Sequence, residues 1–180
     1  EEIQLKLAEF DLQNGIDRKA SGLRPVKPAN IHLTLKFLGE IPLSSVQEIS
    51  ASLNQVSNEL TPFTLSIQGL GAFPGWKNHP RVIWVDAFPK VSIEKVRLKI
   101  EPSLGKLGFP PEDRPFSPHL TLARISNNSR STDELLQRLQ SILPSPFFGH
   151  LLVERIVLFK SDLLPEGPAY SVLSSHIFSH

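Results

Sequence analysis

The segment Asn-Ile-His-Leu-Thr-Leu-Lys-Phe-Leu-Gly at residues 30–39 contains the four residues on which the fold prediction rests. Its apolar residues alternate with His32 and Thr34, which predicts a β-strand over the whole segment. The same four residues, His-Leu-Thr-Leu, occur again at 119–122. Because residues i and i+2 of a strand point to the same side, each copy is expected to present an imidazole beside a hydroxyl group.

The elements predicted around the two copies follow one another in the same order. Hydrophobic periodicity and turn residues place them at 1–12 (helix), 30–39 (strand), 45–60 (helix), 63–68 and 81–87 (strands), 91–101 (helix), 119–125 (strand), 131–143 (helix), and 151–160 and 169–178 (strands). The order helix, motif strand, helix, strand, strand therefore occurs twice, which indicates an internal duplication. We expect an α+β fold in which residues 1–180 form one domain of two pseudo-symmetric lobes, about 1–90 and 91–180, with one motif strand of each lobe at a shared cleft.

Two local signals refine the helix boundaries. Ser45 and Glu48 have the spacing of a capping box, so the second helix is expected to start with a side-chain cap. Pro102 is expected to end or kink the helix predicted before it, because proline lacks the backbone N–H that a helix interior needs.

The repeated motif predicts acid–base chemistry. Two motifs that face each other would place two imidazoles and two hydroxyls around one site. An unperturbed imidazole titrates near pH 6.5, so His32 can donate a proton while His119 accepts one, or the reverse. The hydroxyls of Thr34 and Thr121 can donate hydrogen bonds to phosphate oxygens, and this combination is typical of phosphodiester cleavage.

Two other interpretations of the histidines compete with this one. A single His-x-Thr pair is more often a partly buried histidine that a threonine satisfies, but the repetition of the motif disfavours this for both copies. A metal site is disfavoured because the chain has no cysteine and neither motif contains a carboxylate. We therefore expect no metal and no other cofactor.

Charge and composition limit the partners. The net charge of +1 argues against a protein that coats long nucleic acids. The chain has no cysteine and no apolar run long enough to span a membrane, so a soluble cytoplasmic monomer without membrane contact is the expectation. Five basic residues and no acidic residue lie within 18–36, which indicates either a solvated loop or a local phosphate site: Arg18, Lys19, Arg24, Lys27 and Lys36.

Arg124 ends the second motif and is a further candidate for binding phosphate or a base. Its parity along the predicted strand is opposite to that of His119. A β-bulge or the strand end must therefore reorient its side chain if the two residues act at one site.

The motifs carry a family resemblance. The segments His-Leu-Thr-Leu-Lys-Phe-Leu-Gly-Glu at 32–40, Ser-Pro-His-Leu-Thr-Leu-Ala-Arg at 117–124 and Pro-Arg-Val-Ile-Trp-Val at 80–85 resemble those of the 2H phosphoesterase superfamily. Within it, the chain is most similar to the bacterial and archaeal 2′-5′ RNA ligase branch, also described as RNA 2′,3′-cyclic phosphodiesterases. Members usually open with a strand before the first helix, so the resemblance implies a strand upstream of residue 1.

The resemblance implies a bilobal fold with two antiparallel sheets around a central cleft and helices on the outside. It implies hydrolysis of RNA 2′,3′-cyclic phosphate ends to 2′-phosphomonoesters, and a reversible 2′-5′ ligation. By motif position, His32 would donate a proton to the departing 3′ oxygen and His119 would accept one from water. Thr34, Thr121 and Arg124 would hold phosphate oxygens.

Two alternative functions stay open at this point. One is a 2H phosphodiesterase that acts on a small cyclic-phosphate metabolite. The other is a non-catalytic protein that binds an RNA end or a nucleotide. Both complete His-x-Thr pairs favour an enzyme over a binding protein, whereas nothing in the sequence separates a polymer from a small molecule.

Overall fold

The computed structural model of the chain describes residues 2–3, 5–7, 22–77, 79–112, 115–126, 130–141, 146–165 and 167–179. Its contacts divide the chain into two compact units of three segments each. The first unit comprises Glu1–Thr34, Leu65–Phe88 and Pro118–Leu151, and the second comprises Leu35–Thr64, Pro89–Ser117 and Leu152–His180. Each unit takes segments from both halves of the sequence, so the division into two duplicated lobes stays a prediction about the origin of the chain.

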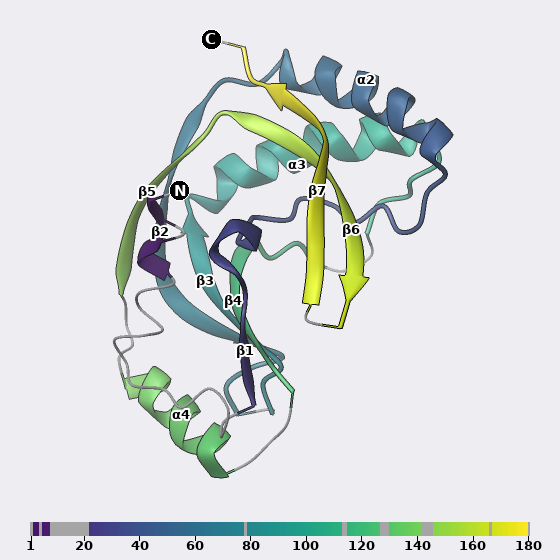
Figure 1. Cartoon of the computed structure of the whole chain (residues 1–180). Coiled ribbons are helices and arrows are strands. Elements are labelled where there is room, and N and C mark those ends of the chain that lie inside the picture. Colours follow the sequence, from purple (N-terminus) through teal and green to yellow (C-terminus); the bar gives the residue numbers. More distant parts are fainter. Residues whose placement is uncertain are drawn as a thin grey trace. The chain divides into compact units, whose positions relative to one another are not determined.

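A five-stranded sheet forms the centre of the first unit. Its strands lie in the order β1 (Leu23–Pro25), β4 (His119–Ile125), β3 (Val82–Phe88), β2 (Phe63–Phe73) and β5 (Phe147–Val153). The pairs β1–β4, β4–β3 and β3–β2 are antiparallel, and Figure 1 shows β1 running beside β4. The predicted α+β class with antiparallel sheets is therefore confirmed.

The two faces of this sheet differ in burial. On β3 the side chains of Ile83, Val85 and Ala87 are at most 3% exposed, whereas Trp84 and Asp86 on the other face are partly exposed. This alternation is the period of two that the sequence predicted for 81–87. One face of the sheet therefore belongs to the core, and the other, called the open face below, is only partly buried.

The second unit consists of two helices and a long hairpin, which Figure 1 shows in blue, teal and yellow. Its elements are α2 (Val46–Ser57), α3 (Lys90–Gly105), β6 (Arg155–Leu164) and β7 (Gly167–Ile177). Helix α2 contacts α3 and both strands. The apolar stripes of these elements meet in one core: Ile49, Leu53, Val56, Leu60, Val96, Ile100, Leu104, Ile156, Leu158 and Phe178.

Helix α3 corrects the prediction for Pro102. The helix continues through the proline to Gly105 instead of ending there. Ile100 and Leu104, which flank the proline, are each 2% exposed in the core of the second unit, and their burial outweighs the loss of one backbone hydrogen bond. No helix in the described ranges combines the length and the apolar character needed to cross a membrane.

The predicted capping box at Ser45 is also wrong. A short 3₁₀ helix, Leu43–Ser45, precedes α2 and gives Ser45 a helical backbone conformation. An N-cap residue needs an extended conformation for its side chain to reach the following N–H groups. Ser45 accordingly makes no side-chain capping hydrogen bond.

Three strand predictions need correction. The segment 30–39 is not a continuous strand, because only Leu33 pairs with the sheet, through a single bridge to Leu120. The strand predicted at 151–160 is two strands, β5 and β6, which meet at Glu154. Strand β1 lies between the elements predicted at 1–12 and 30–39, where no strand was predicted, since three residues are too few for a periodic signal. The remaining helix α4 (Arg130–Ser141) confirms the prediction for that region.

Candidate active site

The two His-x-Thr motifs meet on the open face of the five-stranded sheet. The bridge between Leu33 and Leu120 is antiparallel. When this register is continued by one residue on each side, His32 lies opposite Thr121, and Thr34 lies opposite His119. Side chains opposite each other in an antiparallel pair share a face and have Cβ atoms about 5 Å apart. The bridge therefore places the two motifs side by side in the first unit, and the continued register puts both imidazoles and both hydroxyls on one face.

A backbone contact orients the ring of His32. Its Nδ1 lies 2.7 Å from the carbonyl oxygen of Asn30, the last residue of the short 3₁₀ helix Pro28–Asn30. A carbonyl oxygen can only accept a hydrogen bond, so Nδ1 carries the proton of this pair. Proton exchange with a substrate consequently falls to Nε2.

Two aromatic rings hold the imidazole of His119. The edge of this ring meets Phe73 with the centroids 4.9 Å apart and the planes at 75°. Trp84 lies 6.0 Å away, and it also packs on Phe73 at 5.1 Å. His119 stands at the start of β4, and the aromatic pair from β2 and β3 supports its ring from the same sheet face.

The position of Trp84 depends on a glycine. A Cβ atom added to Gly71 would lie only 2.1 Å from the indole ring, so the ring occupies the space that any larger residue would fill. The indole Nε1 is buried, and it has no hydrogen-bond partner in the part of the chain that the structure describes. The tight packing of the ring on the sheet thus leaves a polar group unsatisfied beside the two motifs.

A bulge in β4 brings Arg124 to the same face. Trp84 pairs with Thr121 and Ile83 pairs with Ala123, so Leu122 is an extra residue in the register between β3 and β4. This extra residue inverts the parity of the strand beyond it. Arg124 pairs with Val82 and lies on the face of His119 and Thr121, although simple alternation places it on the opposite face. The β-bulge that Arg124 needs in order to face the site is therefore present in β4.

Three residues on this face were not singled out as site residues from the sequence, and a fourth, Arg24, was named only as one of the five basic residues within 18–36. Asp86 pairs directly with His119, Trp84 and Phe73 contact its ring, and Arg24 pairs with Arg124. For Trp84 and Asp86 the signal was present, since they alternate with the apolar residues of a predicted strand. For Phe73 and Arg24 no local pattern indicates which strand their neighbours come from.

Comparisons with known proteins agree with this geometry. The family described as LigT-like phosphoesterases matches residues 4–84 and 88–170. The chain belongs to this family. It is 33% identical over 153 residues to an RNA 2′,3′-cyclic phosphodiesterase of Archaeoglobus fulgidus, covering 85% of this chain and 82% of that protein. A Methanocaldococcus jannaschii protein with the same name is 32% identical over 175 residues, or 96% of this chain and 92% of the relative.

A solved structure supports the fold of this LigT-like phosphoesterase. The crystal structure of a Thermus thermophilus protein superposes with a TM-score of 0.76 at 29% identity. The match covers 96% of this chain and 91% of that one. The likeness therefore extends over both compact units and is not limited to the motif strands.

Metal ligands are not grouped in the described part of this phosphoesterase. Among the residues that the structure describes, no three histidine, cysteine, aspartate or glutamate side chains lie together as metal ligands. The two motifs supply imidazole and hydroxyl groups, and threonine hydroxyls are not among the usual ligands of zinc.

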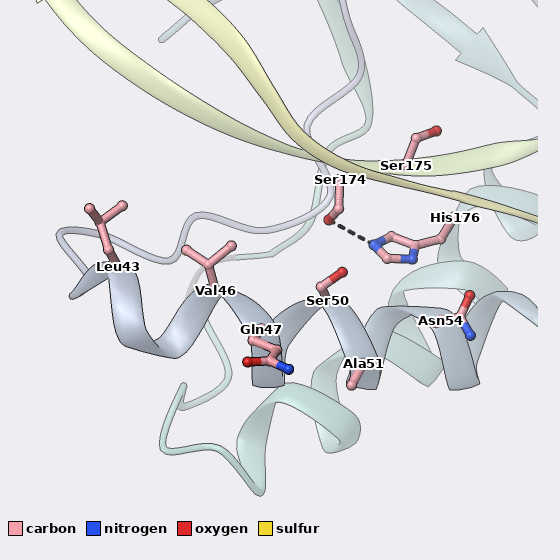
Figure 2. Close-up of a pocket in the computed structure, with 9 residues that line it drawn as sticks. All are labelled: Leu43, Val46, Gln47, Ser50, Ala51, Asn54, Ser174, Ser175 and His176. Carbon is pink, nitrogen blue, oxygen red and sulfur yellow. Dashed lines mark hydrogen bonds between the residues drawn. The ribbon is translucent and has the colours of Figure 1, made fainter.

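A buried histidine, His176, lies in the second unit, where α2 faces β7. Figure 2 shows His176 among uncharged residues of these elements, with its Nε2 2.9 Å from the Oγ of Ser174. His176 is 5% exposed, and burial lowers the pKa of its imidazole. Since Ser174 bonds to the ring and no second titratable group lines this pocket, His176 fits a structural role.

Proposed function

We propose that this LigT-like phosphoesterase hydrolyses the 2′,3′-cyclic phosphate at the end of an RNA chain to a 2′-phosphomonoester. The observation that carries the proposal is the antiparallel register of the two His-x-Thr motifs on one sheet face. Its relatives in Archaeoglobus fulgidus and Methanocaldococcus jannaschii, which are about one-third identical over most of the chain, are named RNA 2′,3′-cyclic phosphodiesterases. This similarity supports RNA ends as the substrate class.

The proposed reaction divides proton transfer between the two imidazoles. His119 accepts a proton from the attacking water, whose oxygen forms the new bond to phosphorus. His32 donates a proton from Nε2 to the 3′ oxygen as the bond between that oxygen and phosphorus breaks. Its Nδ1–H stays bonded to the carbonyl of Asn30 in both protonation states, which keeps the ring in place during transfer. If the 5′-hydroxyl of a second RNA chain attacks phosphorus in place of water, the same proton transfers form a 2′-5′ linkage and free the 3′ oxygen. Exchange of the two roles then reverses this ligation.

The other members of the proposed site bind the phosphate. Thr34 and Thr121 lie opposite the two imidazoles, where their hydroxyls can donate to the non-bridging oxygens as negative charge develops. Arg124 adds a guanidinium on the same face, where it can bind a phosphate group of the substrate. Because one chain supplies both imidazoles, the reaction requires no second copy.

The test uses two substrates and no added metal. Purified protein is incubated with adenosine 2′,3′-cyclic phosphate and with an oligonucleotide that ends in a 2′,3′-cyclic phosphate, with excess EDTA present. We expect turnover in EDTA, a bell-shaped dependence of the rate on pH, and a 2′-phosphate product. Binding without turnover would identify a non-catalytic binding protein instead. Activity that EDTA abolishes and a divalent ion restores would exclude the two-histidine mechanism, and a product with only a 3′-phosphate would exclude the assigned leaving group.

A further inference from the structure

Two arginines lie side by side at the edge of the site. Arg24 on β1 pairs directly with Arg124 on β4, so both side chains share the face of His119 and Thr121. Both residues are exposed. Strand β1 is the edge strand of the sheet, so nothing within the sheet covers the pair from that side.

Strand β1 is short, but hydrogen bonds hold it at both ends. The backbone N–H of Val26 donates to the carbonyl of Leu122 at 2.7 Å. At the other end, the N–H and the hydroxyl of Ser126 both donate to the carbonyl of Gly22, at 3.0 and 2.9 Å. These bonds include the bulge residue itself, so the bulge that reorients Arg124 also anchors the strand that carries Arg24.

The pair is unfavourable by itself. Like charges directly opposite each other in an antiparallel pair destabilise a sheet. The arginines elsewhere that form ion pairs, such as Arg97 and Arg130, have a glutamate within 3.2 Å. Within the described part of the chain, neither Arg24 nor Arg124 has a carboxylate partner. A bound anion would remove the repulsion and use both guanidinium groups.

The location of the pair relative to the motifs indicates which anion this is. Along β4, Arg124 is the next residue after Thr121 on the same face. Because of the bulge, the three-residue step from Thr121 to Arg124 spans the length of two residues of β3, which is about 7 Å. This step is comparable to the length of one nucleotide of a nucleic acid backbone. An anion held by both arginines would therefore lie one nucleotide away from a phosphate held between the two threonines.

We propose that Arg24 and Arg124 together bind the 5′-phosphate of the terminal nucleotide, the phosphate that joins it to the rest of the RNA chain. The inference rests on the proposed function and specifies its substrate class. The enzyme then prefers the end of a chain to a cyclic mononucleotide that lacks this phosphate. Arginine suits the task because its planar guanidinium can donate two parallel hydrogen bonds to one phosphate.

The test compares two small substrates that differ only in this phosphate. These are adenosine 2′,3′-cyclic phosphate and its 5′-phosphorylated form, and kcat/KM is measured for each. In the wild-type protein the 5′-phosphate should raise kcat/KM about ten-fold or more, the usual effect of a hydrogen bond to a charged group. Arg24→Gln should reduce this ratio about ten-fold, and Arg24→Lys should give an intermediate ratio because it keeps the charge but loses the planar fork.

Arg130→Gln is the matched control. Arg130 is an exposed arginine on α4 that pairs with Glu134 and belongs to neither motif, so its substitution should leave the ratio unchanged. If Arg24→Gln does not fold, the salt dependence of the wild-type kcat/KM ratio tests the inference instead. Salt screens the attraction between the exposed arginine pair and the 5′-phosphate, so the ratio should fall as KCl rises.

The outcomes separate this inference from the proposed function. If the wild-type protein hydrolyses neither these two substrates nor the oligonucleotide that ends in a 2′,3′-cyclic phosphate, the proposed function is wrong. If it hydrolyses both with equal kcat/KM, or if the ratio is insensitive to salt, the function stands and the inference is overturned. An unchanged ratio in a folded Arg24→Gln variant would also overturn it, because Arg24 would then act on the fold or on the reacting phosphate.

Discussion

At the level of single residues, the proposed reaction depends on His32 and His119. Replacing either with alanine should lower the single-turnover rate on a cyclic-phosphate end about 10²–10⁴-fold, the usual effect of a positioned proton-transfer group. Replacing both should cost far less than the product of the two single losses, since one imidazole alone supports little of the reaction. Rapid mixing of excess enzyme with labelled oligonucleotide measures these rates.

His150→Ala is the control for both variants. Its ring is exposed at the surface of β5, where it meets Ser66 at 3.3 Å and Phe147, and it belongs to neither motif. The variant should turn over at close to the wild-type rate. If His32→Ala or His119→Ala did the same, that histidine would be a structural residue satisfied by its neighbouring threonine.

At the level of secondary-structure elements, the contact between β2 and β3 depends on Gly71, which has no side chain. Gly71→Ala places a Cβ atom 2.1 Å from the Trp84 ring, which must then move away from Phe73 and His119. We expect a loss of about 1–3 kcal/mol in the free energy of unfolding, the usual cost of overpacking, and a lower kcat as the support of His119 changes. Urea unfolding and steady-state kinetics measure the two effects.

Gly105→Ala provides the comparison in the same protein. Gly105 ends α3, and a Cβ atom added there meets nothing within 4 Å. This substitution should leave activity unchanged and leave the stability equal or slightly higher, because alanine favours a helix. Equal stability and activity of the two variants would mean that the Trp84 ring is free to move.

A buried ion pair joins α3 to the segment that follows the first motif. The Nζ of Lys36 lies 2.6 Å from Glu101 on α3, and their side chains are 3% and 10% exposed. It also donates to the carbonyl of Pro110 at 2.7 Å. Lys36→Met removes one charge of a buried pair and should cost about 3 kcal/mol of stability. The value is at the low end of the usual range because Arg97 still holds Glu101 at 3.2 Å.

Lys99→Met is the control for the buried pair. Lys99 makes an ion pair of the same length, 2.6 Å, with Glu59, but both side chains are largely exposed. Water and salt screen such a pair, so its loss should hardly move the midpoint of urea unfolding. Similar effects of the two substitutions would show that burial does not strengthen the contribution of Lys36.

At the level of the whole molecule, His176 should make stability depend on pH. Burial lowers the pKa of its imidazole in the folded protein, so the folded state holds the ring neutral. As the pH falls below about 6.5, the unfolded chain takes up a proton that the folded chain resists, and the free energy of unfolding decreases. Urea midpoints measured from pH 8 to pH 5 should therefore fall toward low pH, and His176→Gln should reduce this fall.

The same substitution at the exposed His150, His150→Gln, should leave the pH dependence as in the wild-type protein. A decrease of identical size in wild type and His176→Gln would assign the effect to other groups. Unfolding can be followed through the fluorescence of Trp76 and Trp84, which both lie in the first unit, and through far-ultraviolet circular dichroism, which includes the helices of the second.

Local pattern alone was enough for much of the fold. The period of two predicted β3 and β4 to within a residue, and the helical period predicted α2 and α3. These predictions succeed because burial of one face requires apolar residues at regular intervals along the sequence. The motif repeat likewise singled out the two histidines and two threonines. The pattern failed at 30–39, where alternation was present but only Leu33 found a strand partner.

The sequence by itself determined which chemical groups this protein can bring to a phosphate, since the repeated His-Leu-Thr-Leu can be recognised without a structure. Only the tertiary structure decided how they are arranged: the antiparallel register of the motifs, the bulge at Leu122 that turns Arg124 to their face, and the pairing of Arg24 with it. Tertiary structure also buried Lys36 in an ion pair, although the sequence placed it with Arg24 in one basic segment. The physical reason is that strand register follows from the free energy of contacts between residues far apart in the chain, and a local pattern contains no information about the partner.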